Sequence, residues 1–172
     1  MSALAIRDAR AADVPAIESV TLAAYQQYAN QLPAPFWETY RANITGTLAD
    51  VTSAAQLVAE REGRIVGAVL LYPAGAAFPA RDGAAAFTRW PEVRLLAVDP
   101  AERGHGVGEE LMQACIHRAR AAGADALTLH TTPMMEVAMR LYARLGFVHV
   151  PELDFEPAPG LTVRGFRLTL EP

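Results

Sequence analysis

The sequence has very little cysteine, no long apolar segment and no large excess of charge of one sign. Its single cysteine, Cys115, excludes an internal disulfide and a cluster of cysteine ligands for a metal ion. No apolar run approaches the roughly 20 residues that a membrane-spanning helix needs. The formal net charge is −4 and the two signs are interspersed, which argues against nucleic acid or an anionic membrane as a partner. We therefore expect a cytoplasmic protein with no membrane partner.

The composition is typical of one globular domain. Of the 172 residues, 52% are hydrophobic and 20% are charged, and a chain of this length can bury a substantial core. Neither a repeat nor a second domain is evident, so we expect residues 1–172 to form a single domain.

Hydrophobic spacing and turn residues predict the order of the helices and strands. The order is rich in hairpins at first and then continues with strand–helix–strand units, which predicts a mixed α/β fold with helices on both faces of the sheet. We predict strands at residues 4–8, 65–71, 92–98, 126–130, 147–150 and 161–170, a hairpin turn at Gly63, helices after Asp13 and across 36–48, 106–122 and 133–145, and a surface loop across 74–91.

A glycine-rich segment, VDPAERGHGVGEELMQA, carries the strongest chemical signal. Three glycines, at positions 104, 106 and 108, lie between a predicted strand and a predicted helix. Glycine lets a ligand approach the backbone closely, and the N–H groups and dipole at a helix start favour phosphate. Arg103 adds positive charge. The pattern predicts a pyrophosphate site, although an ordinary glycine-rich turn has the same residues. The dinucleotide-binding fingerprint fits poorly, because the third glycine comes too soon.

Two motifs in this chain resemble signatures of the GCN5-related N-acetyltransferase (GNAT) superfamily. The stretch LLAVDPAERGHGVGEELM resembles the acyl-coenzyme A signature, in which Arg103, Gly106 and Gly108 meet the pattern. Further on, AMRLYARLGF resembles the second signature, a helix with a tyrosine followed by Gly-Phe. The resemblance covers residues 90 to 150 and implies a GNAT-like acyl-CoA N-acyltransferase fold with a mostly antiparallel central sheet.

The resemblance also implies a reaction and a set of cofactor contacts. The acetyl group of acetyl-CoA passes to a primary amine by direct attack on the thioester. The backbone after the central strand holds the pyrophosphate, and the strand itself pairs with the pantetheine arm next to a bulge, where a backbone N–H polarises the thioester carbonyl. The expected cofactor-binding residues are Leu96, Ala97, Val98, Arg103, Gly104, His105, Gly106, Val107 and Gly108.

By the same resemblance, Tyr142 is the expected general acid for the departing thiolate. A phenol with a pKa near ~10 can protonate a thiolate whose acid has a pKa near ~8.5. A buried core aromatic is the alternative. The family often has Asn seven residues before this tyrosine, where this chain has Met135, and Thr131 or Thr132 is a candidate replacement.

The general base has two candidates. Glu92 lies where some members of the family place a carboxylate, and a solvated acid at a strand end is the alternative reading. His130, at the end of a later strand, is the second candidate. His117 and His149 have no ligand partners at metal-binding spacing, so we predict no metal site.

The acceptor is expected to be the primary amine of a small molecule. A protein or peptide amine, or a non-catalytic acyl-CoA sensor, is the alternative. We expect the acceptor near the N-terminal helices, the 74–91 loop and the C-terminal strands, with Asp154 and Glu156 as candidate partners for its charge. The resemblance further implies a homodimer. Five aromatic residues are candidates either for the acceptor pocket or for the core: Tyr25, Tyr28, Phe36, Trp37 and Trp90.

Overall fold

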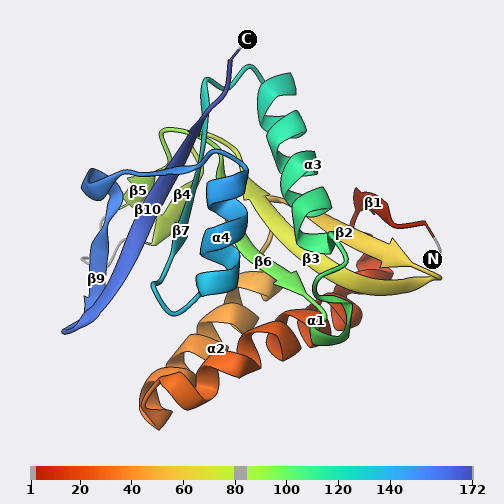
Figure 1. Ribbon diagram of the computed structural model, residues 1–172, viewed down its shortest axis with the longest axis horizontal. Coiled ribbons are helices and arrows are strands. Elements are labelled where there is room, and N and C mark those ends of the chain that lie inside the picture. The colour runs from red at the N-terminus through yellow and green to blue at the C-terminus, as the bar shows by residue number, and fades with distance from the viewer. Residues whose placement is uncertain (1–2, 80–84, 172) are drawn as a thin grey trace. The chain divides into compact units, whose positions relative to one another are not determined.

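The computed structural model describes residues 3–79 and 85–171. The described residues up to Leu71 form one compact unit with Leu95–Ala114, and those of Tyr72–Arg94 and from Cys115 onward form a second. The bounds of the units fall within the residues of strand β6 (Glu92–Val98) and of helix α3 (Val107–Ala121). Figure 1 labels the helices and strands of the chain. Eight strands of the described chain belong to one mostly antiparallel sheet, which confirms the predicted mixed α/β class.

The first unit contains the N-terminal antiparallel strands. Strand β2 pairs with β1 on one side and with β3 on the other. Glu62 and Gly63 connect β2 to β3 with φ values of 52° and 74°, as a tight hairpin turn with two left-handed residues requires, so the predicted hairpin is confirmed. The strands are β1 (Ala5–Asp8), β2 (Ala55–Arg61) and β3 (Arg64–Tyr72).

The helices of the first unit bury one face each. In α1 (Val14–Tyr25) the buried residues include Ile17 and Val20, as the apolar spacing predicts. In α2 (Ala34–Ala49) the apolar spacing of four predicts one inward face, formed by Phe36, Tyr40, Ile44 and Leu48. The prediction is wrong at its start, because Phe36 is 44% exposed whereas Trp37 is 8% exposed. The ring of Trp37 stacks edge-on against Tyr40, and these rings select the inward face. Short 3-10 helices, at Ala11–Asp13, Gln26–Gln31 and Pro100–Glu102, complete the unit.

Helix α3 packs very closely on β3 at Gly67. A Cβ atom at this position would lie 2.9 Å from Val107 Cγ1 and 3.0 Å from both Leu111 Cδ1 and the Ala97 carbonyl oxygen. The helical spacing of Val107, Leu111, Cys115 and Ala119 predicts one apolar stripe along α3, and this is confirmed because all four residues are buried.

The second unit contains the remaining pairs of the sheet. Strands β6 and β7 run parallel, and β10 lies antiparallel to β7, β8 and β9. Strand β9 is absent from our prediction because its four residues include Pro157 and are mostly exposed, so they show no alternating pattern. The strands are β7 (Ala126–Thr131), β8 (Val148–His149), β9 (Phe155–Ala158) and β10 (Leu161–Thr169).

Two further boundaries of the second unit differ from the prediction. Helix α4 (Glu136–Arg144) begins three residues later than expected, after a turn that includes Pro133. The expected 74–91 loop includes a short hairpin of β4 (Ala77–Pro79) and β5 (Ala85–Phe87), while residues 80–84 lie outside the described chain. A 3-10 helix at Pro151–Leu153, which we label η4, precedes β9. No helix in the described ranges combines the length and apolarity needed to cross a membrane.

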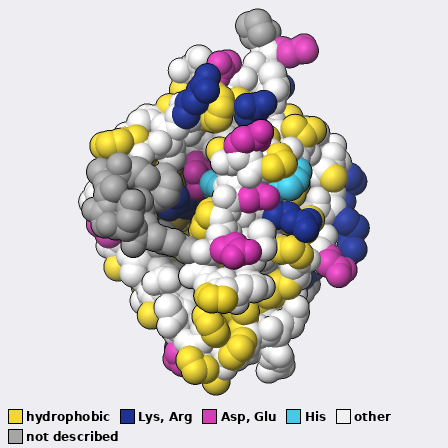
Figure 2. Space-filling model, turned by 90° about the vertical axis from the view of Figure 1, so that its left-hand side faces the viewer, with side chains coloured by type: hydrophobic (Ala, Val, Ile, Leu, Met, Phe, Trp, Pro, Cys, Tyr) yellow, Lys and Arg dark blue, Asp and Glu magenta, His cyan; other side chains and the backbone are white. Residues whose placement is uncertain are grey.

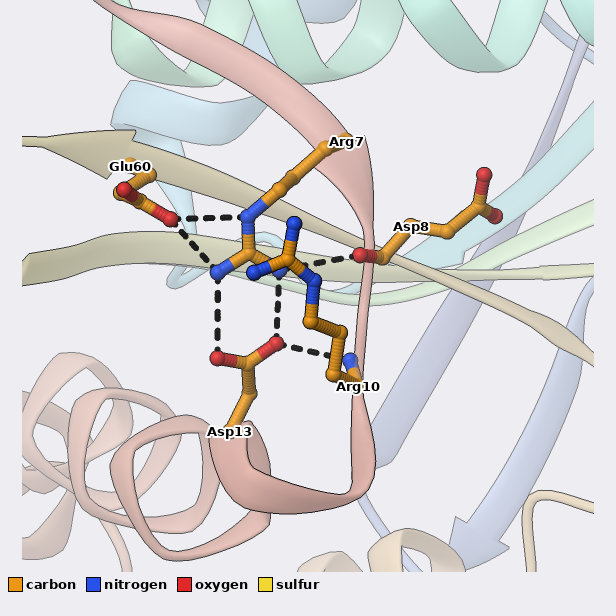
Figure 3. A network of polar contacts seen from close by, with 5 residues as sticks. All are labelled: Arg7, Asp8, Arg10, Asp13 and Glu60. Carbon is orange, nitrogen blue, oxygen red and sulfur yellow. Dashed lines mark hydrogen bonds and ion pairs between the residues drawn. The ribbon is translucent and has the colours of Figure 1, made fainter. Parts of the chain in front are cut away.

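A charged network connects β1, β2 and the start of α1 (Figure 3). Arg7 donates through Nε to Glu60 Oε2 at 2.7 Å and through Nη1 to Asp13 Oδ2 at 2.7 Å. Asp13 lies at the N-cap position of α1, as predicted, but its carboxylate makes no capping bond to the helix. It accepts instead from Arg7 and from the Arg10 backbone N–H at 2.7 Å.

This network makes stability depend on pH. The hydrogen bonds from Arg7 and then from the Arg10 backbone lower the pKa of Asp13 from 3.8 to about 2. A carboxyl group whose pKa is depressed on folding stabilises the fold above its unfolded pKa and loses that effect as the pH falls toward its folded pKa. We predict that Asp13→Asn lowers the free energy of unfolding at pH 7 by up to about 2 kcal/mol.

Urea unfolding of both proteins between pH 7 and pH 3 measures the effect. The deficit of the variant should shrink as the pH falls below about 4. Glu18→Gln, in the same helix, is the matched control and should show no such pH dependence. A deficit of Asp13→Asn that is constant over this range would contradict the assignment.

Candidate functional site

The glycine-rich turn of the first unit lies directly before α3. Gly104 and Gly106 both have φ of +79°, and no heavy atom lies within 4 Å of a Cβ atom built at either position. Helix α3 begins at Val107, so the N–H groups of its first turn have no acceptor within the helix. The predicted strand–turn–helix arrangement is confirmed, and it leaves an open turn at the positive end of the helix dipole. Phosphate binding there stays a prediction.

The side chain of Arg103 has partners within the protein. Its Nη2 donates to the Ala24 carbonyl at 3.0 Å, and its Nη1 donates to Gln27 Oε1 at 3.1 Å. Ala24 is in the last turn of α1, where a cation interacts favourably with the helix dipole. Arg103 therefore anchors the start of the glycine turn to the end of α1, a role that spacing along the sequence does not reveal.

Strand β6 is irregular at Leu95, where the sequence permitted a bulge. Leu95 has a φ of +50°, a left-handed conformation that is costly for leucine. Before it, Glu92 and Val93 pair with β7, and after it, the Asp99 N–H donates to the Val66 carbonyl of β3 at 2.9 Å. The pairing with β7 thus holds before Leu95, while β3 is the neighbour at the other edge of β6.

The cofactor-binding residues expected in this strand differ in exposure. Leu96 and Val98 are half-buried, and Ala97 is 1% exposed. The Tyr25 hydroxyl donates to the Leu96 carbonyl at 3.3 Å. One of the backbone groups that we expected to face the pantetheine arm therefore already has a weak partner.

The two candidate bases, Glu92 and His130, lie together in the second unit. Glu92 is 5% exposed, and its Oε1 accepts from Arg94 Nε at 2.8 Å and lies 3.4 Å from His130 Nδ1. Burial alone raises the pKa of Glu92, but the hydrogen bond from His130 and the charge of Arg94 outweigh it, so the pKa is lowered overall. Sequence reasoning missed Arg94, although the Glu92–Arg94 spacing of two places both side chains on one face of a strand.

The hydrogen bonds of His130 define where a proton can go. Its Nε2 lies 3.0 Å from the Leu153 carbonyl, which can only accept, so Nε2 carries a hydrogen. The Nδ1 atom faces the Glu92 carboxylate, which can only accept, so Nδ1 donates to Glu92 when it carries a hydrogen. The two candidate bases are therefore neighbours that face each other through these atoms.

Tyr142, the candidate acid, is packed within the second unit. It is 7% exposed and lies on α4. Its ring meets that of Phe147 edge-on, with centroids 5.9 Å apart. Tyr142 is thus packed as a buried core aromatic, which is the alternative given for it above. Its role as the general acid stays a prediction.

The threonines beside Met135 have different hydrogen-bonding states. The Thr131 hydroxyl donates to Met135 Sδ at 3.4 Å. The Thr132 hydroxyl is buried and has no hydrogen-bond partner within the described chain. Of the two candidates for the missing Asn, Thr132 is therefore the one with an unused polar group.

The expected aromatic and acidic acceptor residues separate into different roles. Tyr25, Tyr28 and Trp37 are buried, and Tyr25 stacks edge-on with Tyr28, so these rings belong to the core of the first unit. Asp154 accepts from the Gly165 N–H at 2.8 Å and contacts His149 Nε2 at 2.9 Å. The Gly165 N–H first and His149 second lower the pKa of Asp154, so its carboxylate holds the loop before β9.

Comparison with known proteins identifies related sequences and folds. A model of the Acetyltransferase (GNAT) family matches residues 16–147. Mycothiol acetyltransferase of Streptosporangium roseum is 41% identical over 56 residues, which cover 33% of this chain and 17% of that protein. The mycothiol acetyltransferase of Thermobispora bispora matches equally, over 19% of its length. The match therefore spans less than a fifth of these curated relatives.

Solved structures share the fold. A GNAT family acetyltransferase of Brucella melitensis, solved in complex with acetyl-CoA, has a TM-score of 0.59 at 26% identity, covering 100% of this chain and 91% of the other. A GNAT family acetyltransferase of Staphylococcus aureus has a TM-score of 0.73 at 16% identity, covering 98% and 100%. The second similarity concerns the fold alone.

The left-handed conformation of Leu95 leads to a stability prediction. A β-branched residue tolerates a positive φ worse than leucine does, so Leu95→Val should cost about 1–2 kcal/mol of unfolding free energy. Leu96→Val, the matched change one residue along, should cost less because Leu96 has no positive φ. Leu95→Gly should cause the least backbone strain of the three variants, because glycine adopts a positive φ readily. Urea unfolding measures all three, and equal losses for the two valine variants would argue against strain at Leu95.

Proposed function

The chain belongs to the Acetyltransferase (GNAT) family, and from this membership we propose that it transfers the acetyl group of acetyl-CoA to the primary amine of a small molecule. The observation that carries the proposal is the turn before α3, where Gly104 and Gly106 hold φ values of +79° in open surroundings. Glycine at these positions leaves the backbone N–H groups open to a ligand beside the start of α3, so the geometry fits a pyrophosphate.

We assign cofactor binding mainly to backbone groups. Residues 103–108 bind the pyrophosphate through their N–H groups, with Arg103 anchoring the turn and adding positive charge. The backbone of Leu96 to Val98 pairs with the pantetheine arm, and an N–H beside the kink at Leu95 polarises the thioester carbonyl. Acetyl-CoA supplies an activated acyl group with a thiolate as the leaving group. The Thr132 hydroxyl has no hydrogen-bond partner among the described residues, which supports its use as the polar contact that Asn makes elsewhere in the family.

Proton transfer is assigned to side chains of the second unit. A primary amine is mostly protonated at neutral pH and must lose a proton before it attacks. We propose that Glu92 and His130 accept this proton as a pair, at His130 Nδ1, with Glu92 stabilising the charged imidazole. Tyr142 donates a proton to the departing thiolate.

The names of the curated relatives support a small-molecule acceptor. The curated relatives are mycothiol acetyltransferases, named for a small molecule rather than for a protein. The single-domain organisation of residues 1–172 and the homodimer stay predictions. Release of free thiol from acetyl-CoA with a panel of small amines and peptides tests the proposal. Turnover of peptides alone would move the acceptor to protein amines, and binding without any turnover would indicate a sensor.

Acetyl-CoA binding should stabilise the fold in a way that depends on the glycine turn. At about 100 times its dissociation constant a ligand adds about 2.7 kcal/mol, which shifts Tm by roughly 5–11 °C for a chain of this size. Gly106→Glu should abolish the shift, because a side chain and a negative charge then occupy the phosphate position.

Gly123→Glu is the matched control for this substitution. Gly123 has a φ of +76° and equally open surroundings, but it lies at the other end of α3. The control therefore introduces the same strain and charge and should retain the shift. Loss of the shift in both variants, or its absence in the wild type, would overturn the site.

The proposed acid can be tested by removing one hydroxyl group. Tyr142→Phe removes the hydroxyl group and keeps the ring and its contact with Phe147. General acid catalysis contributes ~10²–10⁴-fold, and kcat should fall by about that factor with little change in acetyl-CoA affinity. Single-turnover kinetics under conditions where chemistry limits the rate provide the measurement. If the variant retains the wild-type kcat, Tyr142 is not the general acid and serves only in packing.

A further inference from the structure

One face of the sheet in the second unit carries the proposed proton-accepting pair and an excess of positive charge. Thr128 of β7 is the cross-strand partner of Glu92 on β6 and of Arg167 on β10. Directly paired residues project from the same face of a sheet, so Glu92, Thr128 and Arg167 form one row across three strands. His130 is two residues beyond Thr128 and shares that face. Strand axes lie about 4.8 Å apart, which separates the β6 and β10 backbones by about 10 Å.

The guanidinium of Arg167 has no ionic partner in the described chain. Its contact is with the Trp90 ring, 5.2 Å from the ring centroid, and Arg89 lies over the same ring at 4.4 Å. Neither arginine makes a hydrogen bond or ion pair within the described residues, whereas Arg94 in the same region is paired with Glu92. Two cations with no counter-ion among the described residues therefore meet at one half-buried aromatic ring, in a chain whose net charge is −4.

This charge balance is the opposite of what an amine alone requires. A site that binds only an ammonium group is expected to be acidic, yet Glu92 is the one acid in this row and it already faces two basic groups. Arginine offers a planar set of donors that matches a carboxylate or a phosphate in a bidentate manner. Figure 2 views the side of the molecule on which β9 and β10 lie, and basic, acidic and histidine side chains gather there in a hollow of the surface.

We propose that the acceptor carries an oxyanion, a carboxylate or a phosphate, that binds the Arg167 guanidinium on the Trp90 ring, while its amine reaches the Glu92–His130 pair. This inference rests on the proposed acetyltransferase function and narrows its substrate class to amines with a separate negative group. The ring of Trp90 holds Arg167 in place, so its donors are preorganised for the anion.

Matched acceptors test the inference through kinetics. The two pairs are an amino carboxylate with its carboxamide and an amino phosphate with its alcohol. In at least one pair the anionic member should have a kcat/KM about 10- to 100-fold higher. The pair with the larger ratio identifies the oxyanion. Arg167→Leu should reduce that ratio to about 1, and Arg167→Gln provides a second variant if the first folds poorly.

Arg164→Leu is the matched control for the kinetic test. It removes the same charge from β10, but residue 164 alternates with 165 and 167 and projects from the opposite face. The control should keep the wild-type ratio. Ratios near 1 for both wild-type pairs, or ratios unaffected by loss of Arg167, would overturn the inference.

A binding experiment separates this inference from the proposed function. The sequence has two tryptophans, so in a Trp37→Phe background Trp90 is the only fluorescent one. Titration with glutarate and with inorganic phosphate, which carry no amine, should give a saturable change with at least one of them. The change should be lost with Arg167→Leu and kept with Arg164→Leu. A saturable change without turnover of any amine would refute the acetyltransferase and leave the anion site. Turnover of an amine with neither a fluorescence response nor a preference for the anionic acceptor would support the acetyltransferase and refute the anion site.

Discussion

The conformation of one residue, Leu95, marks where strand β6 loses its regular pairing with β7. A strand keeps a neighbour along its length only if its backbone stays regular, and β6 does not, because φ of Leu95 is +50°. The pairing with β7 holds at Glu92 and Val93, and β3 is the neighbour at the other edge of β6. The division of the chain into two compact units falls at the same point, between Arg94 and Leu95. A backbone that leaves its neighbour in this way exposes N–H and C=O groups that a ligand can use as another strand would.

The two units contribute different kinds of chemistry to the proposed reaction. In the first unit the candidate site consists of backbone: left-handed glycines and the N–H groups at the start of α3. Such groups carry fixed partial charges that do not titrate, which suits a cofactor that must be held at every pH. In the second unit it consists of side chains whose protonation changes, with Glu92 and His130 on one strand pair and Tyr142 on α4. Cofactor binding and proton transfer are thus assigned to separate parts of the chain.

The sequence predicted those features that depend on neighbouring residues. The hairpin at Gly63 and the turn before α3 follow from glycines at positions that only glycine accepts easily, and the α3 stripe follows from helical spacing. It did not predict that His130 meets Glu92, because that contact depends on the register of two parallel strands 36 residues apart. Nor did it predict that Arg103 bonds to Ala24, or that Trp37 rather than Phe36 faces inward, since both depend on packing between separate elements.

Gly165 of β10 lies under the η4 segment, where a Cβ atom would come within 2.2 Å of Leu153 Cβ. The backbone of Leu153 also accepts the hydrogen bond from His130 Nε2, so the position of this loop and the orientation of the imidazole are coupled. Every amino acid that a single base change in a glycine codon can introduce is larger than glycine. Any substitution of Gly165 therefore displaces the loop and turns the imidazole together. Under the proposed role of His130, one such substitution would alter the surroundings of the acceptor and the proton-accepting group at the same time.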